Sequence, residues 1–148
     1  MKFLKIRDVK SPTRGTAKSA GIDLYIPNDF IETTLAPGQS VLIPAGLKVN
    51  IPENYAFIAF NKSGVATKRH LVVGACVIDE DYQGEIHIHI FNHSNKESVT
   101  LYAGEKIIQC VLIPVKYASI EMVESEEDLW DGEVTERGEG GFGSTGIK

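Results

Sequence analysis

The stretch Glu85-Ile-His-Ile-His-Ile-Phe-Asn92 decides the fold class, because its side chains alternate between apolar and polar. In an extended strand the three isoleucines share one face, and His87 and His89 share the other. A period of two residues is typical of a half-buried β-strand. We therefore expect a sheet with one face in a hydrophobic core.

Similar runs recur on both sides of this stretch. No window shows a sustained helical stripe, and we find no internal repeat. Many short strands at short spacing predict an all-β protein, a jelly-roll-like distorted β-barrel. The candidate strands are rich in β-branched and aromatic residues, are bounded by Pro, Gly, Asn and Asp, and lie near residues 3–9, 22–26, 30–35, 40–43, 46–51, 55–60, 71–78, 85–92, 99–102, 106–113 and 115–122.

Length and composition set the broad class. The chain has 148 residues, 43% of them hydrophobic, which suits one domain with a real core. No apolar run approaches the roughly 18 residues that a membrane-spanning helix needs. The start, MKFLKIRDVK, mixes charged and apolar residues too evenly for a signal peptide. We expect a cytoplasmic protein (host cytoplasm if the source is viral) with Cys76 and Cys110 as buried, reduced thiols.

Charge is divided unevenly along the chain. Residues 1–117 hold 13 Lys/Arg and 11 Asp/Glu, whereas residues 118–147 hold nine acidic residues and one base, Arg137. An acidic segment argues against a nucleic-acid polymer or an anionic membrane as partner, because both attract basic surfaces. We predict a β-barrel domain over residues 1–120, and an acidic spacer with a C-terminal lid arm over residues 121–148.

The end of the chain differs in kind from the rest. Residues 137–146 contain five of the chain's 14 glycines and cannot pack a core, so we expect a flexible glycine-rich arm. A phosphate could be bound by the Arg137 guanidinium, the hydroxyls of Ser144 and Thr145, and the glycine N–H groups of this arm, while a flat base stacks on Phe142. A solvated terminus is the alternative interpretation.

Two internal segments carry further candidate chemistry. Lys62-Ser63-Gly64 follow a predicted strand and offer a cation, a hydroxyl and a glycine to a phosphate, although an ordinary turn has the same composition. Asp79 ends an apolar strand before a turn that contains Tyr82. A carboxylate there could accept a proton from water or bind a cation, and a solvated hairpin tip is the alternative.

The remaining acid and the histidines favour simpler interpretations. Asp23 lies among apolar neighbours, where an acid is more often a hydrogen-bonding residue at a strand end than a metal ligand. His87 and His89 form a pair, but zinc needs three or four ligands, so we interpret them as histidines of a polar face.

Taken in order, the segments AGIDLY, NKSGVA, GACVIDEDYQGEI, GEKIIQCVL and RGEGGFGSTG resemble the five motifs of the trimeric dUTP pyrophosphatases (dUTPases). The resemblance extends from about residue 14 to residue 146. It implies a homotrimer with active sites shared at the subunit junctions. It also implies Mg²⁺-dependent hydrolysis of dUTP to dUMP and pyrophosphate by water attack on the α-phosphorus. That reaction limits uracil incorporation into DNA and supplies dUMP for thymidylate synthesis.

The resemblance assigns roles to individual residues. Asp79 matches the acid that orients and deprotonates the water, and Arg137 would reach the leaving group when the arm closes. Asp23 matches an acid that holds Mg²⁺ through ordered water. Tyr82 would pack on the deoxyribose, and the strand pair around residues 75–87 would read uracil through backbone groups. All the positions that match substrate contacts are Lys62, Ser63, Gly64, Val77, Tyr82, His87, Gln109, Arg137, Phe142, Gly143, Ser144 and Thr145.

The chain departs from the usual family pattern at the second and third motifs. Lys62 stands where the family commonly has arginine, after Asn61 where it has proline, and Cys76 stands where it has glycine. A dCTP deaminase, the rival enzyme of the same fold, carries a further arginine where this chain has Thr67. A non-catalytic relative would lack Asp79, for example. The resemblance therefore implies dUTP hydrolysis rather than either rival.

Overall fold

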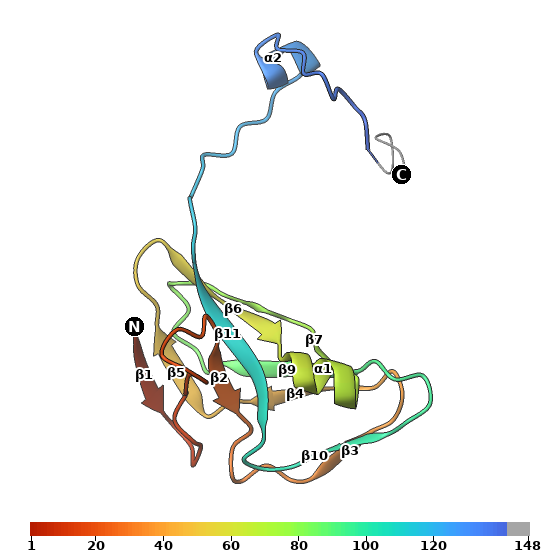
Figure 1. Cartoon of the computed structure of the whole chain (residues 1–148). Helices are drawn as coiled ribbons and strands as arrows, with labels where there is room; N and C mark the ends of the chain where they lie inside the picture. Colours follow the sequence, from red (N-terminus) through yellow and green to blue (C-terminus); the bar gives the residue numbers. More distant parts are fainter. Residues whose placement is uncertain (142–148) are drawn as a thin grey trace. The chain divides into compact units, whose positions relative to one another are not determined.

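The computed structural model describes residues 1–141 of the chain (Figure 1). The chain divides into two compact units, Met1–Lys116 and Tyr117–Lys148. The predicted contacts of Phe142, Gly143, Ser144 and Thr145 lie outside the described residues. That the segment after residue 120 acts as spacer and lid stays a prediction.

The first unit is built from short strands, as predicted, and the structure pairs them antiparallel. Its elements are β1 (Lys2–Lys5), β2 (Ile22–Tyr25), β3 (Thr33–Leu35), β4 (Ser40–Pro44), β5 (Leu47–Asn50), β6 (Tyr55–Asn61), α1 (Ser63–Arg69), β7 (Leu71–Val73), β8 (Val77–Ile78), β9 (His87–Asn92), β10 (Val99–Leu101) and β11 (Lys106–Pro114).

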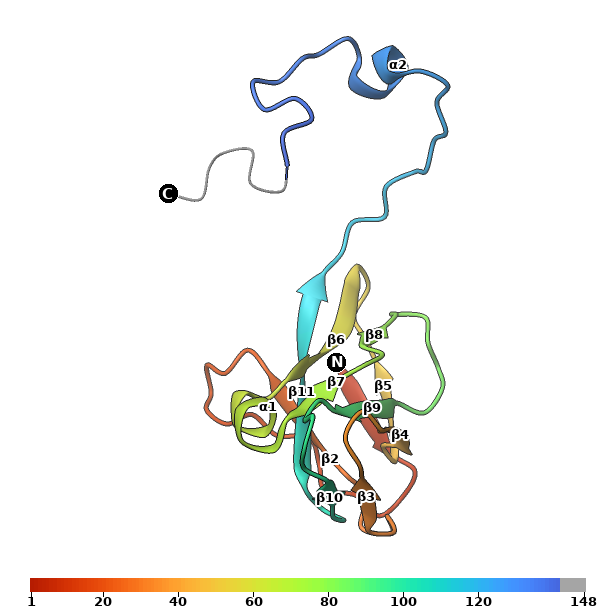
Figure 2. The same cartoon turned by 90° about the vertical axis from the view of Figure 1, so that its right-hand side faces the viewer.

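Hydrogen bonding groups these strands into sheets of order β2-β11-β6-β8 and β4-β9-β7, with the pairs β1-β5 and β3-β10. In Figure 2 the β3-β10 pair lies at one end of this unit and the end of β11 at the other.

The alternation in β9 is confirmed. Ile88 and Ile90 are each 1% exposed, whereas His87 is exposed and His89 is half-buried. The isoleucines face a core whose largest fully buried members also include Phe57 and Leu24. Burying such side chains supplies most of the free energy that favours folding. Because β4 and β7 flank β9, this core fixes the strand that lines the candidate site.

Three sequence predictions need correction. The expected strand at 115–122 is absent, and Ile120 within it is 94% exposed. Helix α1 was missed because it buries no residue and therefore has no apolar stripe. Cys76 is half-buried rather than buried, although it and the buried Cys110 are both free thiols.

The second unit contains one short helix, α2 (Glu126–Trp130). The Ser125 hydroxyl caps it by accepting a hydrogen bond from the Asp128 backbone N–H at 3.1 Å. Its first turn carries three acidic side chains, which interact favourably with the positive end of the helix dipole. Among the described residues, no helix is long and apolar enough to cross a membrane.

Candidate active site

A cavity of about 200 Å³ lies beside the edge strand β8, and it gathers most of the third-motif residues. Its floor is apolar and comes from the core side of the sheet, including Ala59 and Ile108. Its rim is polar. The cavity is lined by Ala59, Ala75, Cys76, Val77, Ile78, Asp79, Tyr82, Ile86, His87 and Ile108.

The turn after β8 fixes the position of Tyr82. The Tyr82 hydroxyl donates to the Glu85 carbonyl at 2.9 Å, and the Tyr82 N–H donates to the Asp79 carbonyl at 3.2 Å. A methyl group added at Gly84 would lie 2.8 Å from Cε2 of the Tyr82 ring, so only glycine allows the ring to fold back here. The Glu80 carboxylate, in turn, accepts from the Asn54 N–H at 2.5 Å and ties this turn to the start of β6. Asp79 itself remains exposed at the cavity.

A second cluster forms around Asp23 on β2. The residue is 3% exposed, and its two carboxylate oxygens pair with the ammonium groups of Lys62 and Lys106, the latter at 3.1 Å. Burial raises the pKa of Asp23, but the hydrogen bonds from both lysines outweigh burial and hold that pKa below its ordinary value. The same contact raises the pKa of Lys106 above its ordinary value. Asp23 is therefore a buried carboxylate with a positively charged partner on each oxygen.

The other predicted phosphate contacts surround this cluster. Ser63 and Gly64 follow Lys62 directly and open α1, and a Cβ added at Gly64 would meet nothing within 4 Å. Gln109 is the register partner of Asp23 across β11 and β2, and its side-chain N–H donates to the Asn61 carbonyl at 2.9 Å. The structure thus brings Asp23, Lys62, Ser63, Gly64 and Gln109 together from segments distant in sequence.

Two residues of this cluster were missed from the sequence. Lys106 lies in the fourth motif, GEKIIQCVL, but the sequence assigned it no role, because its contact with Asp23 depends on strand pairing across 83 positions. Asn61 looked only like a departure from the family pattern. In the structure its amide oxygen accepts from the Val73 N–H at 2.7 Å, which ties the end of β6 to β7.

The apolar floor of the Asp79 cavity and the side chain of Gln109 lie on opposite faces of the same sheet. Directly paired residues share a face, and successive residues alternate. Gln109 pairs with both Asp23 and Phe60, so these three face one side. Ala59 and Ile108, which line the Asp79 cavity, belong to the buried face. The cavity that Asp79 lines does not include Gln109, and the cavity that Gln109 lines does not include Asp79.

Arg137 lies in the second unit, where its Nε donates to the Gly140 carbonyl at 2.7 Å. Its role at the leaving group stays a prediction.

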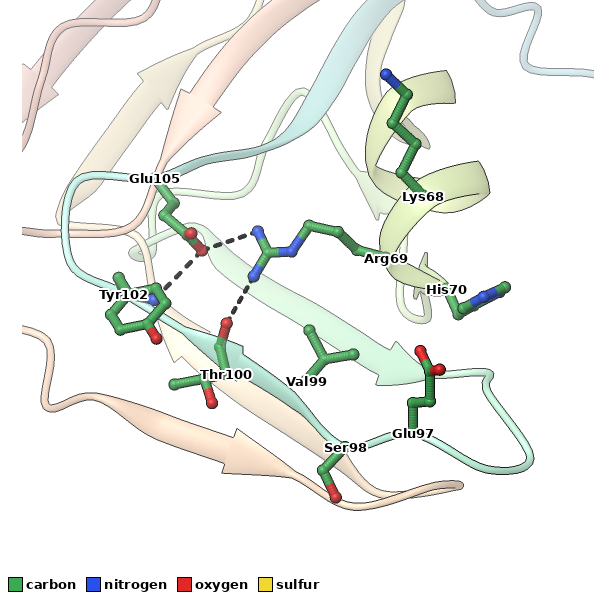
Figure 3. A pocket seen from close by; sticks show the side chains of 9 residues that line it. All are labelled: Lys68, Arg69, His70, Glu97, Ser98, Val99, Thr100, Tyr102 and Glu105. Carbon is green, nitrogen blue, oxygen red and sulfur yellow. Dashed lines mark hydrogen bonds and ion pairs between the residues drawn. The ribbon is translucent and has the colours of Figure 1, made fainter.

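A separate hollow of about 470 Å³ lies at the end of α1 and contains none of the predicted site residues (Figure 3). Arg69 crosses it and donates to the Glu105 carboxylate at 3.1 Å and to the Thr100 carbonyl at 2.6 Å. Glu105 also accepts from the Tyr102 N–H at 3.2 Å. These hydrogen bonds tie α1 to the turn between β10 and β11, so we interpret this network as structural.

Within the described residues, no group of three or more His, Cys, Asp or Glu side chains could hold a metal ion. His89 accepts a hydrogen bond from the Ala75 N–H at 3.2 Å through Nδ1. The fold and the two clusters define the class of protein. It is an antiparallel β-barrel protein with a small cavity beside a carboxylate and a separate lysine-rich cluster.

Comparison with protein-family models matches residues 7–146 to the dUTPase family. Relatives named deoxyuridine 5'-triphosphate nucleotidohydrolase cover nearly the whole chain. The Yarrowia lipolytica protein is 41% identical over 142 residues, 95% of this chain and 84% of the relative. The Mus musculus protein is 34% identical over 147 residues, 99% of this chain and 85% of the relative. This chain belongs to the dUTPase family.

A solved structure agrees with this membership. The dUTPase of Staphylococcus bacteriophage 80alpha with dUpNHpp superimposes with a TM-score of 0.83 and 28% identity, covering 99% of this chain and 98% of that one. The family, the all-β jelly-roll-like fold and the enzyme class of nucleotidohydrolase are therefore confirmed as the motifs predicted them. The roles of individual residues stay predictions.

Proposed function

We propose that this protein hydrolyses dUTP to dUMP and pyrophosphate by attack of water on the α-phosphorus. The observation that carries this proposal is the cavity beside β8, where Asp79 and Tyr82 stand at the rim of a small apolar space. Pockets for drug-sized ligands measure about 300–1,000 Å³. A cavity of about 200 Å³ suits a single flat base, with the sugar and phosphates outside it.

Strand β8 is well placed to select uracil. It is the last strand of the β2-β11-β6-β8 sheet, so one of its edges is unpaired within the described structure. An edge strand offers free backbone N–H and C=O groups. Uracil presents both donors and acceptors on one edge, and such a strand can match that pattern while rejecting cytosine. Tyr82 would then pack on the deoxyribose and leave no room for a 2′-hydroxyl.

Asp79 is the proposed general base. Its carboxylate would orient the attacking water and accept its proton while the water oxygen bonds to the α-phosphorus. The bond from the α-phosphorus to the oxygen that bridges it to the β-phosphorus breaks, and pyrophosphate leaves. Arg137 and the glycine-rich arm would close over the bound substrate and stabilise negative charge on the leaving phosphates. Phe142 would cover the base from the same arm.

A second copy of the chain would complete the site. Within one chain the cavity beside Asp79 is floored by Ala59 and Ile108 of the core face, whereas Gln109 lies on the other face of the sheet and lines a separate cavity. The face with Gln109 also carries apolar groups, with Phe60 42% exposed and Val77 60% exposed. Burying such a face against another copy is favourable. These observations support a site shared between subunits, and the resemblance to the trimeric dUTPases favours a homotrimer.

We treat Mg²⁺ as part of the substrate, bound to the phosphates of dUTP. The described residues hold no ready-made metal site, and both oxygens of Asp23 are engaged by lysines. When bound, Mg²⁺ neutralises charge on the triphosphate and favours release of pyrophosphate. In the cytoplasm this activity would limit uracil incorporation into DNA and supply dUMP.

The test is pyrophosphate release from dUTP, UTP, dTTP and dCTP, with Mg²⁺ and with EDTA. Turnover of dUTP at rates far above the other three supports the proposal. Equal turnover of UTP would contradict the role of Tyr82, and ammonia release from dCTP would indicate a deaminase. Binding of dUpNHpp without turnover of dUTP would indicate a non-catalytic relative.

A further inference from the structure

The cluster of Asp23, Lys62 and Lys106 holds more positive charge than burial of one carboxylate requires. A buried acid needs a positively charged partner because it has lost its hydration. Asp23 has two such partners, Lys62 after β6 and Lys106 on β11. Two ammonium groups around one carboxylate leave a single net positive charge at this point of the surface.

The exposure of the three side chains shows which of them an incoming ligand would meet. The Asp23 side chain is 5% exposed, the Lys62 side chain 23% and the Lys106 side chain 43%. The carboxylate therefore lies beneath the ammonium groups. An anion that approaches from solvent reaches both lysines before it reaches Asp23.

The position of the cluster indicates what kind of anion it would bind. Lys62 is directly followed by Ser63 and Gly64. Lys106 lies on the same strand as Gln109, which pairs in register with Asp23. The net positive charge is therefore centred among residues that the proposed function assigns to phosphate contacts.

We propose that Lys106 is a further phosphate-binding residue of this site, and that Asp23 is a positioning residue that holds the Lys62 and Lys106 ammonium groups. This inference rests on the proposed function and deepens it. The positioning role of Asp23 takes the place of the water-mediated Mg²⁺ contact that the resemblance implies, because a divalent cation there would face two positive charges. Mg²⁺ would instead be held by the phosphates.

The arrangement has a physical advantage for binding. Lysine side chains are long and lose much conformational freedom when a ligand fixes them. Hydrogen bonds to the buried carboxylate fix the ammonium ends of both lysine side chains before the substrate arrives, so less side-chain conformational freedom is lost on binding. The carboxylate belongs to a strand whose backbone is held by β11 and by Thr13, which makes it a rigid anchor.

The first test is the variant Lys106→Gln, with binding of dUpNHpp and of dUMP measured by calorimetry. A hydrogen bond to a charged group is worth about 1.5–3 kcal/mol, which corresponds to about a 10- to 150-fold loss of affinity. We expect such a loss for dUpNHpp and a smaller one for dUMP, which lacks the β- and γ-phosphates. Lys106→Arg keeps the charge and should retain most of the affinity, because this side chain is more exposed than Lys62 and can turn toward the phosphates without displacing Lys62 from Asp23. Lys48→Gln, at an exposed lysine of β5, is the matched control and should leave binding unchanged.

The second test separates positioning from metal binding at Asp23. In Asp23→Asn, we expect dUpNHpp affinity in EDTA to fall about tenfold, as for loss of one charge-assisted contact. The Mg²⁺ concentration that gives half-maximal turnover should stay unchanged. Unchanged or tighter binding in EDTA, together with a raised Mg²⁺ requirement, would overturn the positioning role. Should Asp23→Asn fail to fold, the Lys106→Gln and Lys106→Arg pair decides the phosphate contact.

Failure of the inference differs from failure of the proposed function. Wild-type protein that turns over dUTP, with Lys106→Gln binding dUpNHpp as tightly, would overturn the inference alone. Wild-type protein that neither binds dUpNHpp nor releases pyrophosphate from dUTP would overturn the proposed function.

Discussion

Replacing Gly21 with alanine should destabilise the protein by displacing Gln109. The buried Gly21 lies against this side chain, and an added methyl group would overlap its Oε1 and lie 2.9 Å from Cδ and 3.0 Å from Cβ. The amide can swing away only by giving up its 2.9 Å hydrogen bond to the Asn61 carbonyl, worth about 0.5–1.5 kcal/mol. The contact with Cβ remains, and overpacking of this kind costs about 1–3 kcal/mol. We therefore expect the free energy of unfolding to fall by about 1.5–4.5 kcal/mol.

Urea denaturation of a double-mutant cycle measures this effect. In a Gln109→Ala background the amide is already absent, so Gly21→Ala should cost about 1 kcal/mol less than in the wild type. Gly64→Ala is the matched control, because its Cβ would meet nothing within 4 Å and alanine favours the helix. An equal cost of Gly21→Ala in both backgrounds would show that the glycine is not needed to accommodate Gln109.

Four further predictions follow from the site. Asp79→Asn should lower kcat by at least about 100-fold, as loss of a general base does, while thermal unfolding and dUpNHpp affinity stay near wild type. Deleting residues 137–148 should leave unfolding of the first unit unchanged and strongly lower kcat, and precipitation of the truncated chain would contradict this. The pKa of Asp23 is lower in the folded state than its ordinary value, so the ionised carboxylate stabilises the fold above that ordinary pKa. This stabilisation is lost as the pH falls through the pKa of the folded state. Asp23→Asn should remove that loss from acid denaturation curves. Lys62→Arg should weaken dUpNHpp binding in calorimetry rather than strengthen it.

The strands were predictable because their signal is local. The alternation of apolar and polar residues over 85–92 predicts an extended strand with one buried face, and the buried isoleucines of β9 confirm it. Helix α1 was not predictable in this way, since none of its residues is buried and its N-cap, Lys62, makes no side-chain cap hydrogen bond. It forms on backbone hydrogen bonds such as Ala66 N–H to the Lys62 carbonyl at 2.8 Å. The expected strand at 115–122 had suitable residues, but the pairing of β11 with β6 ends at Pro114 and Tyr55, where β6 begins, and the Val115 N–H donates to the Asn54 carbonyl at 2.9 Å.

The residues of the Asp79 cavity were predictable together because most of them are neighbours in sequence. Asp79, Tyr82 and His87 belong to one turn and the strand after it, so a motif captures them together. The Asp23–Lys106 contact depends on a register shift between Lys106 and Ile108 in the pairing of β11 with β2. No spacing in the sequence encodes that shift.

The same contact explains why lysine can stand at position 62, where the family commonly has arginine. A guanidinium forks over both oxygens of a carboxylate. Lys62 is a point charge and engages one oxygen of Asp23, which leaves the other for Lys106. Arginine at position 62 would compete with Lys106 for the second oxygen and leave that ammonium group unfixed. The departure at position 62 and the lysine at position 106 are thus two parts of one arrangement, in which a single buried acid holds two charges toward the phosphates.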